Sequence, residues 1–228
     1  MRYDNYVLAT FREHPNRFIA WVELEGRQEK VHVKNTGRCK ELLLPGARVV
    51  LTEGQNPNRK TRYDLVAVWK DGLGWVNIDS QAPNKVVQEW LRSGCSPFEG
   101  ITYLQPEYTY GKSRMDFYLE CGARRILLEV KGCTLEVAGQ GYFPDAPTER
   151  GVRHLQELQG ALQQGFESYL VFVIAMPGVK SVLPNLKTHP EFGKVLQAAW
   201  QAGVRVIYLT CTVTPDSLTA SNYSQKIR

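Results

Sequence analysis

Hydrophobic and polar residues alternate along the first third of the chain in the pattern typical of half-buried strands. In NRFIAWVELEG, every second residue from Phe18 to Leu24 is apolar and shares one face of a strand. Four more short segments with strand character follow, separated by turns rich in Gly, Pro and Asn: QEKVHVKN, ARVVLTEG, RYDLVAVW and GWVNID. Five short strands and one helical turn at CKELLL predict a small OB-fold-like barrel over residues 1–82.

A different pattern begins near residue 83. Amphipathic periodicity predicts three helices, at NKVVQEWLRSG, ERGVRHLQELQGALQQG and HPEFGKVLQAAWQAG, with Thr148 as the N-cap of the second. Five segments read as strands: ITYLQPEYTY, SRMDFYLE, RRILLEVKGC, SYLVFVIAM and VRVIYLT. The order α-β-β-β-α-β-α-β predicts a mixed α/β domain over residues 83–228, with helices on both faces of a mixed sheet. The polar tail after Pro215 is expected to be loosely held.

Composition limits the possible environments and chemistries. No apolar run approaches the ~20 residues that cross a bilayer, and the first residues lack a signal-peptide pattern. The five cysteines include no CxxC pair, so neither a disulfide framework nor a zinc site is indicated. No GxxxxGK[ST], GxGxxG or GxSxG motif is present, which argues against the nucleotide and serine-hydrolase chemistries of those motifs. A soluble cytoplasmic protein without a membrane partner is expected. A homodimer is possible on the sequence alone.

Positive charge is concentrated in one stretch. The formal charge is +5, and between Lys34 and Arg62 seven basic residues face only Glu41 and Glu53. Concentrated basicity is typical of polyanion binding, and chance clustering on a solvated surface is the alternative. The turn at Asn35–Arg38 is either an anion-binding turn or an ordinary loop. The candidate nucleic-acid contacts of this stretch are Lys34, Asn35, Thr36, Arg38, Lys40, Arg59, Lys60 and Arg62.

Candidate catalytic chemistry lies in SRMDFYLECGARRILLEVK, residues 113–131. If the two strands form a hairpin, Asp116 on the first lies beside Glu129 and Lys131 on the second, opposite the apolar faces that enter the core. Mg²⁺ usually takes one or two carboxylates together with water and substrate phosphate. Lys131 would position a water molecule or stabilise the developing charge on phosphorus. The pattern predicts metal-assisted phosphodiester hydrolysis, and a salt bridge on a solvated sheet face is the alternative.

Two residues of the predicted second helix are secondary candidates. Arg150 and His154 are four positions apart and lie off the leucine stripe. Arg150, close to the helix start, is a candidate phosphate ligand. His154 is either an acid, base or phosphate donor, or a half-exposed structural histidine. Asp145, just before the helix, is interpreted as a loop cap in preference to a metal ligand.

Several blocks of the sequence together resemble one family. HVKNTGRCKELLLPGARVVL, NPNRKTRYDL, YGKSRMDFYLE, LLEVKGCTL and YFPDAPTERGVRHLQEL are similar to the bacterial sugar fermentation stimulation protein A family, and the resemblance covers nearly the whole chain. It implies an N-terminal OB-like domain and a restriction-endonuclease-like domain with a PD-(D/E)xK core. It also implies DNA binding and a suspected nuclease activity whose substrate the family leaves open.

The resemblance assigns roles to individual residues. Asp116 and Glu129 become the metal-binding acids, with Mg²⁺ or Mn²⁺ as the expected cofactor, and Lys131 the catalytic-type lysine. A further metal-binding Glu from the preceding helix corresponds to Glu89, with Glu107 as the competing candidate.

Arg114, two residues before Asp116, joins the candidate nucleic-acid contacts. The chain departs from the family name at Met115, where the nuclease pattern has Pro, and the literal Pro144–Asp145 follows the lysine and is out of order. Two functional hypotheses result: a metal-dependent nuclease, or a non-catalytic DNA-binding regulator on a nuclease-like scaffold. A carbohydrate-binding barrel is a weaker alternative, because its tryptophans alternate with apolar strand residues.

Overall fold

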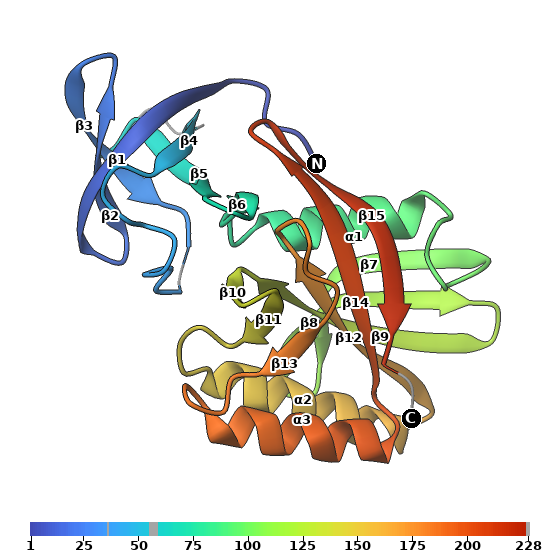
Figure 1. Cartoon of the computed structure of the whole chain (residues 1–228). Coiled ribbons are helices and arrows are strands. Elements are labelled where there is room, and N and C mark those ends of the chain that lie inside the picture. Colours follow the sequence, from blue (N-terminus) through green and yellow to red (C-terminus); the bar gives the residue numbers. More distant parts are fainter. Residues whose placement is uncertain (36, 55–58, 227–228) are drawn as a thin grey trace.

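The first six strands form a barrel domain. The computed structural model describes residues 1–35, 37–54 and 59–226 (Figure 1). The strands pair in the order β3-β2-β1-β4-β5-β6, and β3 also pairs with β5, which closes five of them into a barrel. Their bounds are Tyr6–Asn16, Ile19–Leu24, Arg27–Val33, Arg48–Glu53, Tyr63–Lys70 and Gly74–Asn77 for β1 to β6. The predicted OB-like barrel is therefore confirmed.

Strand β1 is missing from the sequence prediction. Its inward residues are Val7, Ala9 and Phe11, and the rest of the strand is polar or exposed. So short an apolar alternation, followed by Arg, Glu and His, gives a weak strand signal. The strand is nevertheless central to the barrel, because it lies between β2 and β4 and pairs with both.

The second half of the chain forms a sheet domain. Six strands pair in the order β15-β14-β12-β9-β8-β7, with β12 parallel to both β9 and β14 and the other neighbours antiparallel. The bounds are Ile101–Tyr110 for β7, Ser113–Cys121 for β8, Arg124–Cys133 for β9, Phe166–Ile174 for β12, Arg205–Thr214 for β14 and Ser217–Gln225 for β15. The predicted mixed sheet is confirmed. The prediction for the tail is wrong, because β15 pairs along most of its length with β14.

Helices cover both faces of this sheet. Helix α1 (Ala82–Arg92) packs on one face with Phe117, Leu119 and Leu128. Helices α2 (Glu149–Leu162) and α3 (Pro190–Ala202) lie together on the opposite face (Figure 1). The Thr148 side chain accepts a hydrogen bond from the Gly151 amide at 3.1 Å, which is the predicted N-cap. The sheet is therefore covered by helices on both faces.

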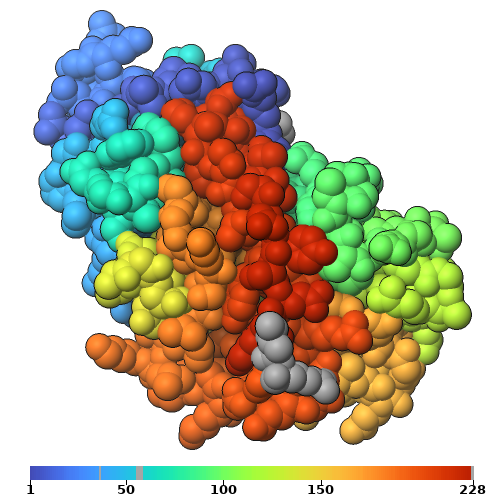
Figure 2. Space-filling model, turned by 45° about the vertical axis from the view of Figure 1, so that its right-hand side comes forward, coloured from blue at the N-terminus to red at the C-terminus, as the bar shows by residue number. Residues whose placement is uncertain are grey.

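A small third sheet and a shared core join the two domains. Strands β10 (Leu135–Val137), β11 (Gln140–Phe143) and β13 (Val182–Pro184) form this sheet, which the sequence did not indicate. One apolar cluster contains barrel residues together with Phe172 and Phe192 of the sheet domain. The β14–β15 hairpin, red in Figure 2, reaches the blue barrel domain, where Arg2 pairs with Asp216 at 2.8 Å. Within the described residues, no helix is long and apolar enough to span a membrane.

Candidate metal centre and nucleic-acid interface

Asp116 lies where strands β8 and β9 separate. The two strands pair from Cys121–Arg124 to Phe117–Leu128. Asp116, which precedes Phe117 in β8, is the first residue beyond this pairing. The Asp116 carboxylate takes the place of the next ladder partner, because its Oδ2 accepts the Val130 amide at 2.7 Å. Its Oδ1 accepts the side-chain amide of Asn84, in the first turn of α1, at 2.7 Å. The hairpin thus exists, and its open end holds the first acid.

Alternation along SRMDFYLE predicts that Met115 and Phe117 lie on the same face of β8, and this prediction is wrong at the open end. Met115 packs with Leu127 and Leu158 on the α2 side, whereas Phe117 faces α1. The alternation of β8 breaks because its pairing with β9 stops at Phe117. Both sheet faces are covered, so the charged groups do not project from a solvated face. They meet at a buried junction instead.

Glu129, on β9, is 1% exposed and its contacts are polar. Its Oε1 atom accepts hydrogen bonds from the Lys131 ammonium and from His154 Nδ1, the latter at 2.5 Å. Arg150 Nε donates to His154 Nε2 at 3.2 Å, so that nitrogen is the acceptor of the imidazole and Nδ1 carries the proton. His154 is therefore a buried link between Arg150 and Glu129.

The second oxygen of Glu129 differs from the first. Among the described residues, Oε2 is buried and has no hydrogen-bond partner. Buried polar atoms are nearly always paired, so Glu129 Oε2 is open to a hydrogen bond from water or to a ligand, as are Glu41 Oε1 and Glu157 Oε2 elsewhere in the described residues. The orientation is fixed by the two donors on Oε1.

The two acids have opposite pKa shifts. Burial, and then the nearby negative charge of Glu129, raise the pKa of Asp116 above its ordinary value of 3.8, against the opposing Lys131 charge and Val130 hydrogen bond. Burial also raises the pKa of Glu129, but the Lys131 charge and the His154 hydrogen bond outweigh it, and the net pKa is lowered. Glu129 is thus anionic, and the negative charge of Asp116 is incompletely compensated. A cation between them would stabilise both.

A cavity of about 340 Å³ between the two domains, here called the acid cavity, is lined by Asp116, Glu129, Lys131 and Arg150. The barrel domain contributes Asn35 to the opposite side. The structure thus brings five predicted site residues to one place, with His154 directly behind Glu129. The Lys131–Glu129 ion pair exists but is buried, unlike the solvated salt bridge of the alternative interpretation.

Neither candidate for a third acid joins this group. Glu89 has a side chain 60% exposed, pairs with the Met1 amino group at 2.6 Å and lines a different groove. Asn84 and Glu89 are five residues apart and so face different sides of α1, which is why the helix contributes the amide and not the acid. Glu107 is exposed and pairs with Arg114 at 3.5 Å. In the described ranges, no three His, Cys, Asp or Glu side chains form a metal-binding group.

Half of the six basic candidates in the stretch from Lys34 to Arg62 have acidic partners. Lys34 pairs with buried Asp79 at 3.0 Å and Arg62 with Glu53 at 2.9 Å. Arg59 is held by both carboxylate oxygens of Asp64. Within the part of the chain that the structure describes, Lys60, Arg38 and Lys40 form no ion pair, and Thr36 lies outside it.

A groove of about 940 Å³, here called the barrel groove, runs between the barrel domain and α1. Lys34, Lys60 and Lys85 line it, and it shares Asn35 and Ser80 with the acid cavity. Four acids also line the groove and offset this charge: Asp4, Glu53, Asp64 and Glu89. The groove is therefore a mixed-charge surface that leads to the acid cavity.

Sequence reasoning missed Asn84 at the site, and it assigned no close contact to Gly37 of the Asn35–Arg38 turn. Asn84 had no signal, because its partner Asp116 is 32 residues away in the sequence and no local pattern links the two. Gly37 is required by a close approach, since a Cβ built there would lie 2.0 Å from Asp145 Oδ2. That carboxylate accepts the Arg38 amide at 3.0 Å, so Asp145 caps a loop of the other domain.

The chain is thus a two-domain protein, with an OB-like barrel, a mixed-sheet domain and two acids at the junction between them. The family model of the sugar fermentation stimulation protein RE domain matches residues 81–217, and that of the SfsA N-terminal OB domain matches residues 13–78. The chain belongs to the sugar fermentation stimulation protein (SfsA) family.

Relatives and one solved structure match over nearly the full length. Sugar fermentation stimulation protein homologs of Desulfitobacterium hafniense and Clostridium beijerinckii are 50% and 47% identical over 223 residues. Each match covers 98% of this chain, and 96% and 98% of the respective relative. The structure of Pyrococcus furiosus SfsA in complex with Ca²⁺ has 28% identity and a TM-score of 0.85, covering 96% of both chains.

Proposed function

We propose that the chain is a divalent-metal-dependent nuclease that hydrolyses phosphodiester bonds in DNA. The observation that carries the proposal is the buried, unpartnered Oε2 of Glu129 in a cavity that Asp116 and Lys131 also line, within the described residues. Two carboxylates in one polar cavity are the donor set that Mg²⁺ takes from proteins, with water and phosphate completing its coordination. The Ca²⁺ complex of the Pyrococcus furiosus relative supports a divalent cation in this family.

Different residues around the acid cavity would bind the metal ion, orient water and bind phosphate. When bound, the cation supplies neutralisation of phosphate charge and a lowered pKa for its water. Asp116 and Glu129 would hold it, with Glu129 fixed through Oε1 by Lys131 and His154. Lys131, 16% exposed in its side chain, orients the attacking water or stabilises charge on the phosphoryl oxygens. Arg150, on the cavity lining, binds a phosphate oxygen.

The test is cleavage of single-stranded, duplex and branched DNA in Mg²⁺ or Mn²⁺, by wild type and by Lys131→Ala. Wild type should cut at least one substrate, and Lys131→Ala should cut at least about 100-fold more slowly. The matched control is Lys112→Ala, an exposed lysine in the β7–β8 turn. Activity in Lys131→Ala equal to that of the control, or no cleavage of any substrate, would refute the proposal.

A non-catalytic DNA-binding regulator is the second candidate. It is favoured by the barrel groove, whose lysines do not line the acid cavity. Its affinity for DNA would fall steeply with salt because bound phosphates release counterions. Metal binding separates the two functions. Calorimetry with Mn²⁺ should detect binding that Asp116→Ala loses if the nuclease proposal is right, and no binding if the scaffold is inactive.

A further inference from the structure

A second concave surface on the barrel domain carries free positive charge. This basic pocket, about 520 Å³, is lined by Arg17, Arg38, Lys40 and His14 and contains no acidic residue in its lining. Arg17, Arg38 and Lys40 are exposed, and none forms an ion pair among the described residues. This contrasts with Lys34, Arg59 and Arg62, which are all paired with acids. Three of the barrel domain's unpaired basic side chains therefore lie together in the basic pocket.

The basic pocket borders the acid cavity. Two loops, one from each domain, meet where the Arg38 amide donates to Asp145. Gly37 and Asp145 line the acid cavity, whereas the next residues along these loops, Arg38 and Ala146, line the basic pocket. On its other border, the acid cavity shares lining residues with the barrel groove. The acid cavity thus borders the basic pocket, whose described lining has no acid, and the barrel groove, whose lining includes Lys34, Lys60 and Lys85.

The size of the acid cavity limits what can enter it. A volume of about 340 Å³ is at the lower end of the range of small-molecule pockets. A space of this size matches a nucleotide of one strand. Phosphate contacts set the position of a strand on a protein without reading its sequence. Contacts on both borders of the cavity would hold the strand on both sides of the reacting phosphate.

We infer that the basic pocket binds the phosphate backbone of the substrate, so that a single strand runs from the barrel groove across the acid cavity to Arg17, Arg38 and Lys40. A strand held on both sides of the acids needs no free end, and cleavage is therefore internal. The inference rests on the proposed nuclease function and adds the path and strandedness of the substrate. It also identifies Arg17 and His14 as interface residues outside the basic stretch 34–62.

The first test measures binding without catalysis. Fluorescence anisotropy with a labelled single-stranded oligonucleotide, in EDTA and at several salt concentrations, gives affinity and its salt slope. The triple variant Arg17→Gln, Arg38→Gln, Lys40→Gln should lose about 0.7 in slope for each phosphate contact removed, and thus about 2 in total. At about 0.1 M salt this corresponds to roughly a 100-fold weaker affinity.

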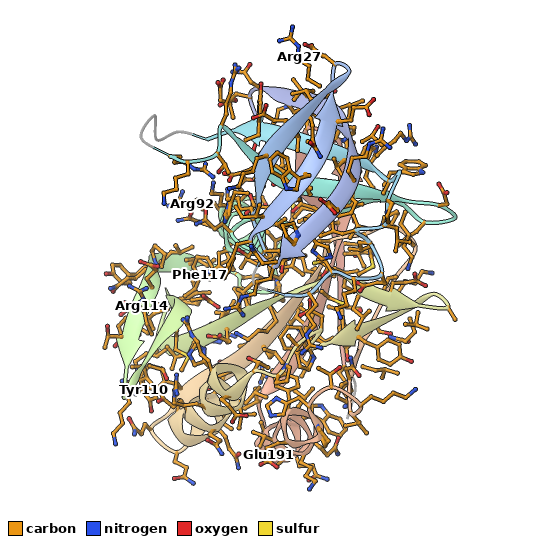
Figure 3. All side chains as sticks on the ribbon, turned by 90° about the vertical axis from the view of Figure 1, so that its left-hand side faces the viewer. Arg27, Arg92, Tyr110, Arg114, Phe117 and Glu191 are labelled. Atoms are coloured by element: carbon orange, nitrogen blue, oxygen red, sulfur yellow. The ribbon has the colours of Figure 1, made fainter. Side chains whose placement is uncertain are left out.

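A triple variant with the same charge change is the control. Arg27→Gln, Lys30→Gln and Lys194→Gln remove three exposed charges outside the basic pocket, the barrel groove and the acid cavity. Figure 3 shows Arg27 at the tip of the β2–β3 hairpin, at the end of the barrel away from the sheet domain. The control should bind within about two-fold of wild type. Equal losses in the two triple variants, or no loss in the pocket variant, would overturn the inference while leaving the Lys131 test of nuclease activity untouched.

The second test separates internal cleavage from digestion at ends. A covalently closed single-stranded circle and a linear strand of the same sequence are incubated with wild type and Mn²⁺. Both should be cut at similar rates, and degradation of the linear strand alone would overturn internal cleavage. If neither is cut, the nuclease proposal fails, and the strand path with it. Loss of binding in the pocket variant alone would then support only a phosphate contact.

Discussion

Two buried acid clusters of this protein are held in opposite ways. In the barrel domain, Asp64 on β5 receives Arg59 through both oxygens and His32 Nδ1 at 2.8 Å. Burial raises the pKa of Asp64, but the hydrogen bonds from Arg59 and His32 outweigh it and the net pKa is lowered. The cluster supplies its own cations, and nothing further is needed to stabilise the carboxylate.

In the acid cavity the balance is different. The pKa of Asp116 is raised by burial and by Glu129, and one Glu129 oxygen has no partner within the described residues. Both clusters contain buried acids, so burial of an acid does not by itself identify a functional site. A carboxylate with donors on both oxygens, such as Asp64, stabilises the fold, whereas two acids with one unpartnered oxygen and one incompletely compensated charge are suited to bind a cation from outside.

The comparison is tested most strongly by the same type of change in each cluster. Glu129→Gln removes a charge that would hold the cation, so Mn²⁺ binding by calorimetry should be lost and DNA cleavage should fall at least about 100-fold. Asp64→Asn should leave Mn²⁺ affinity unchanged in the folded protein. Loss of metal binding in Asp64→Asn, or its retention in Glu129→Gln, would contradict the assignment of the two clusters.

His154 should affect the metal less directly, through the orientation of Glu129. His154→Leu removes the donor to Oε1, and partners of metal ligands typically change affinity 10–100-fold, so Mn²⁺ binding should weaken by about that factor. His154→Asn can place an amide N–H near the position of Nδ1 and should restore part of the affinity. Calorimetry of both variants checks this, and equal affinities for the two would argue against a positioning role.

Stability without metal should change with opposite sign in the two clusters. Asp64→Asn breaks a buried pairing and leaves Arg59 without its carboxylate, which should lower the free energy of unfolding by about 2 kcal/mol. Asp116→Asn removes an uncompensated charge and should raise it by about 1 kcal/mol. Urea unfolding in EDTA gives both values through the midpoint at constant slope. A loss of stability in Asp116→Asn would show that its charge is compensated.

The pH dependence should separate the clusters further. Asp64 has a lowered pKa, so its contribution is present above the unfolded value of 3.8 and is lost as pH falls through the folded pKa. Asp116 has a raised pKa, so its contribution is present below 3.8 and is lost as pH rises through the folded pKa. Between about pH 7 and about pH 4, the advantage of wild type over Asp64→Asn should therefore shrink only at the acid end. The advantage of Asp116→Asn over wild type should shrink as pH falls through the raised folded pKa of Asp116 toward the unfolded value of 3.8. Parallel curves for the two variants would contradict the pKa directions.

Local patterns in the sequence predicted most of the fold. Strict alternation identified β2 and the neighbouring barrel strands. The i, i+2 spacing of Glu129 and Lys131 on a hairpin with Asp116 predicted that the three side chains lie together, and all three line the acid cavity. Strand β15 was missed because its residues are mostly polar and its stability comes from pairing with β14. Periodicity cannot report such a tertiary effect.

The electrostatics of the site depend on partners that are distant in sequence. Lys34 and Asp79 are 45 residues apart, and Arg38 and Asp145 are 107 apart. No local pattern reveals these contacts, so a stretch that reads as uniformly basic is in fact divided into paired and free charges. The phase of α1 likewise decided that Asn84, and not Glu89, contacts Asp116.

The most direct measurement of the central claim is anomalous diffraction from crystals soaked in Mn²⁺. One strong anomalous peak is expected in the acid cavity, with the manganese ion bound by an Asp116 oxygen and by Glu129 Oε2. A cavity without a peak, or a manganese ion bound at Asp64 instead, would contradict it.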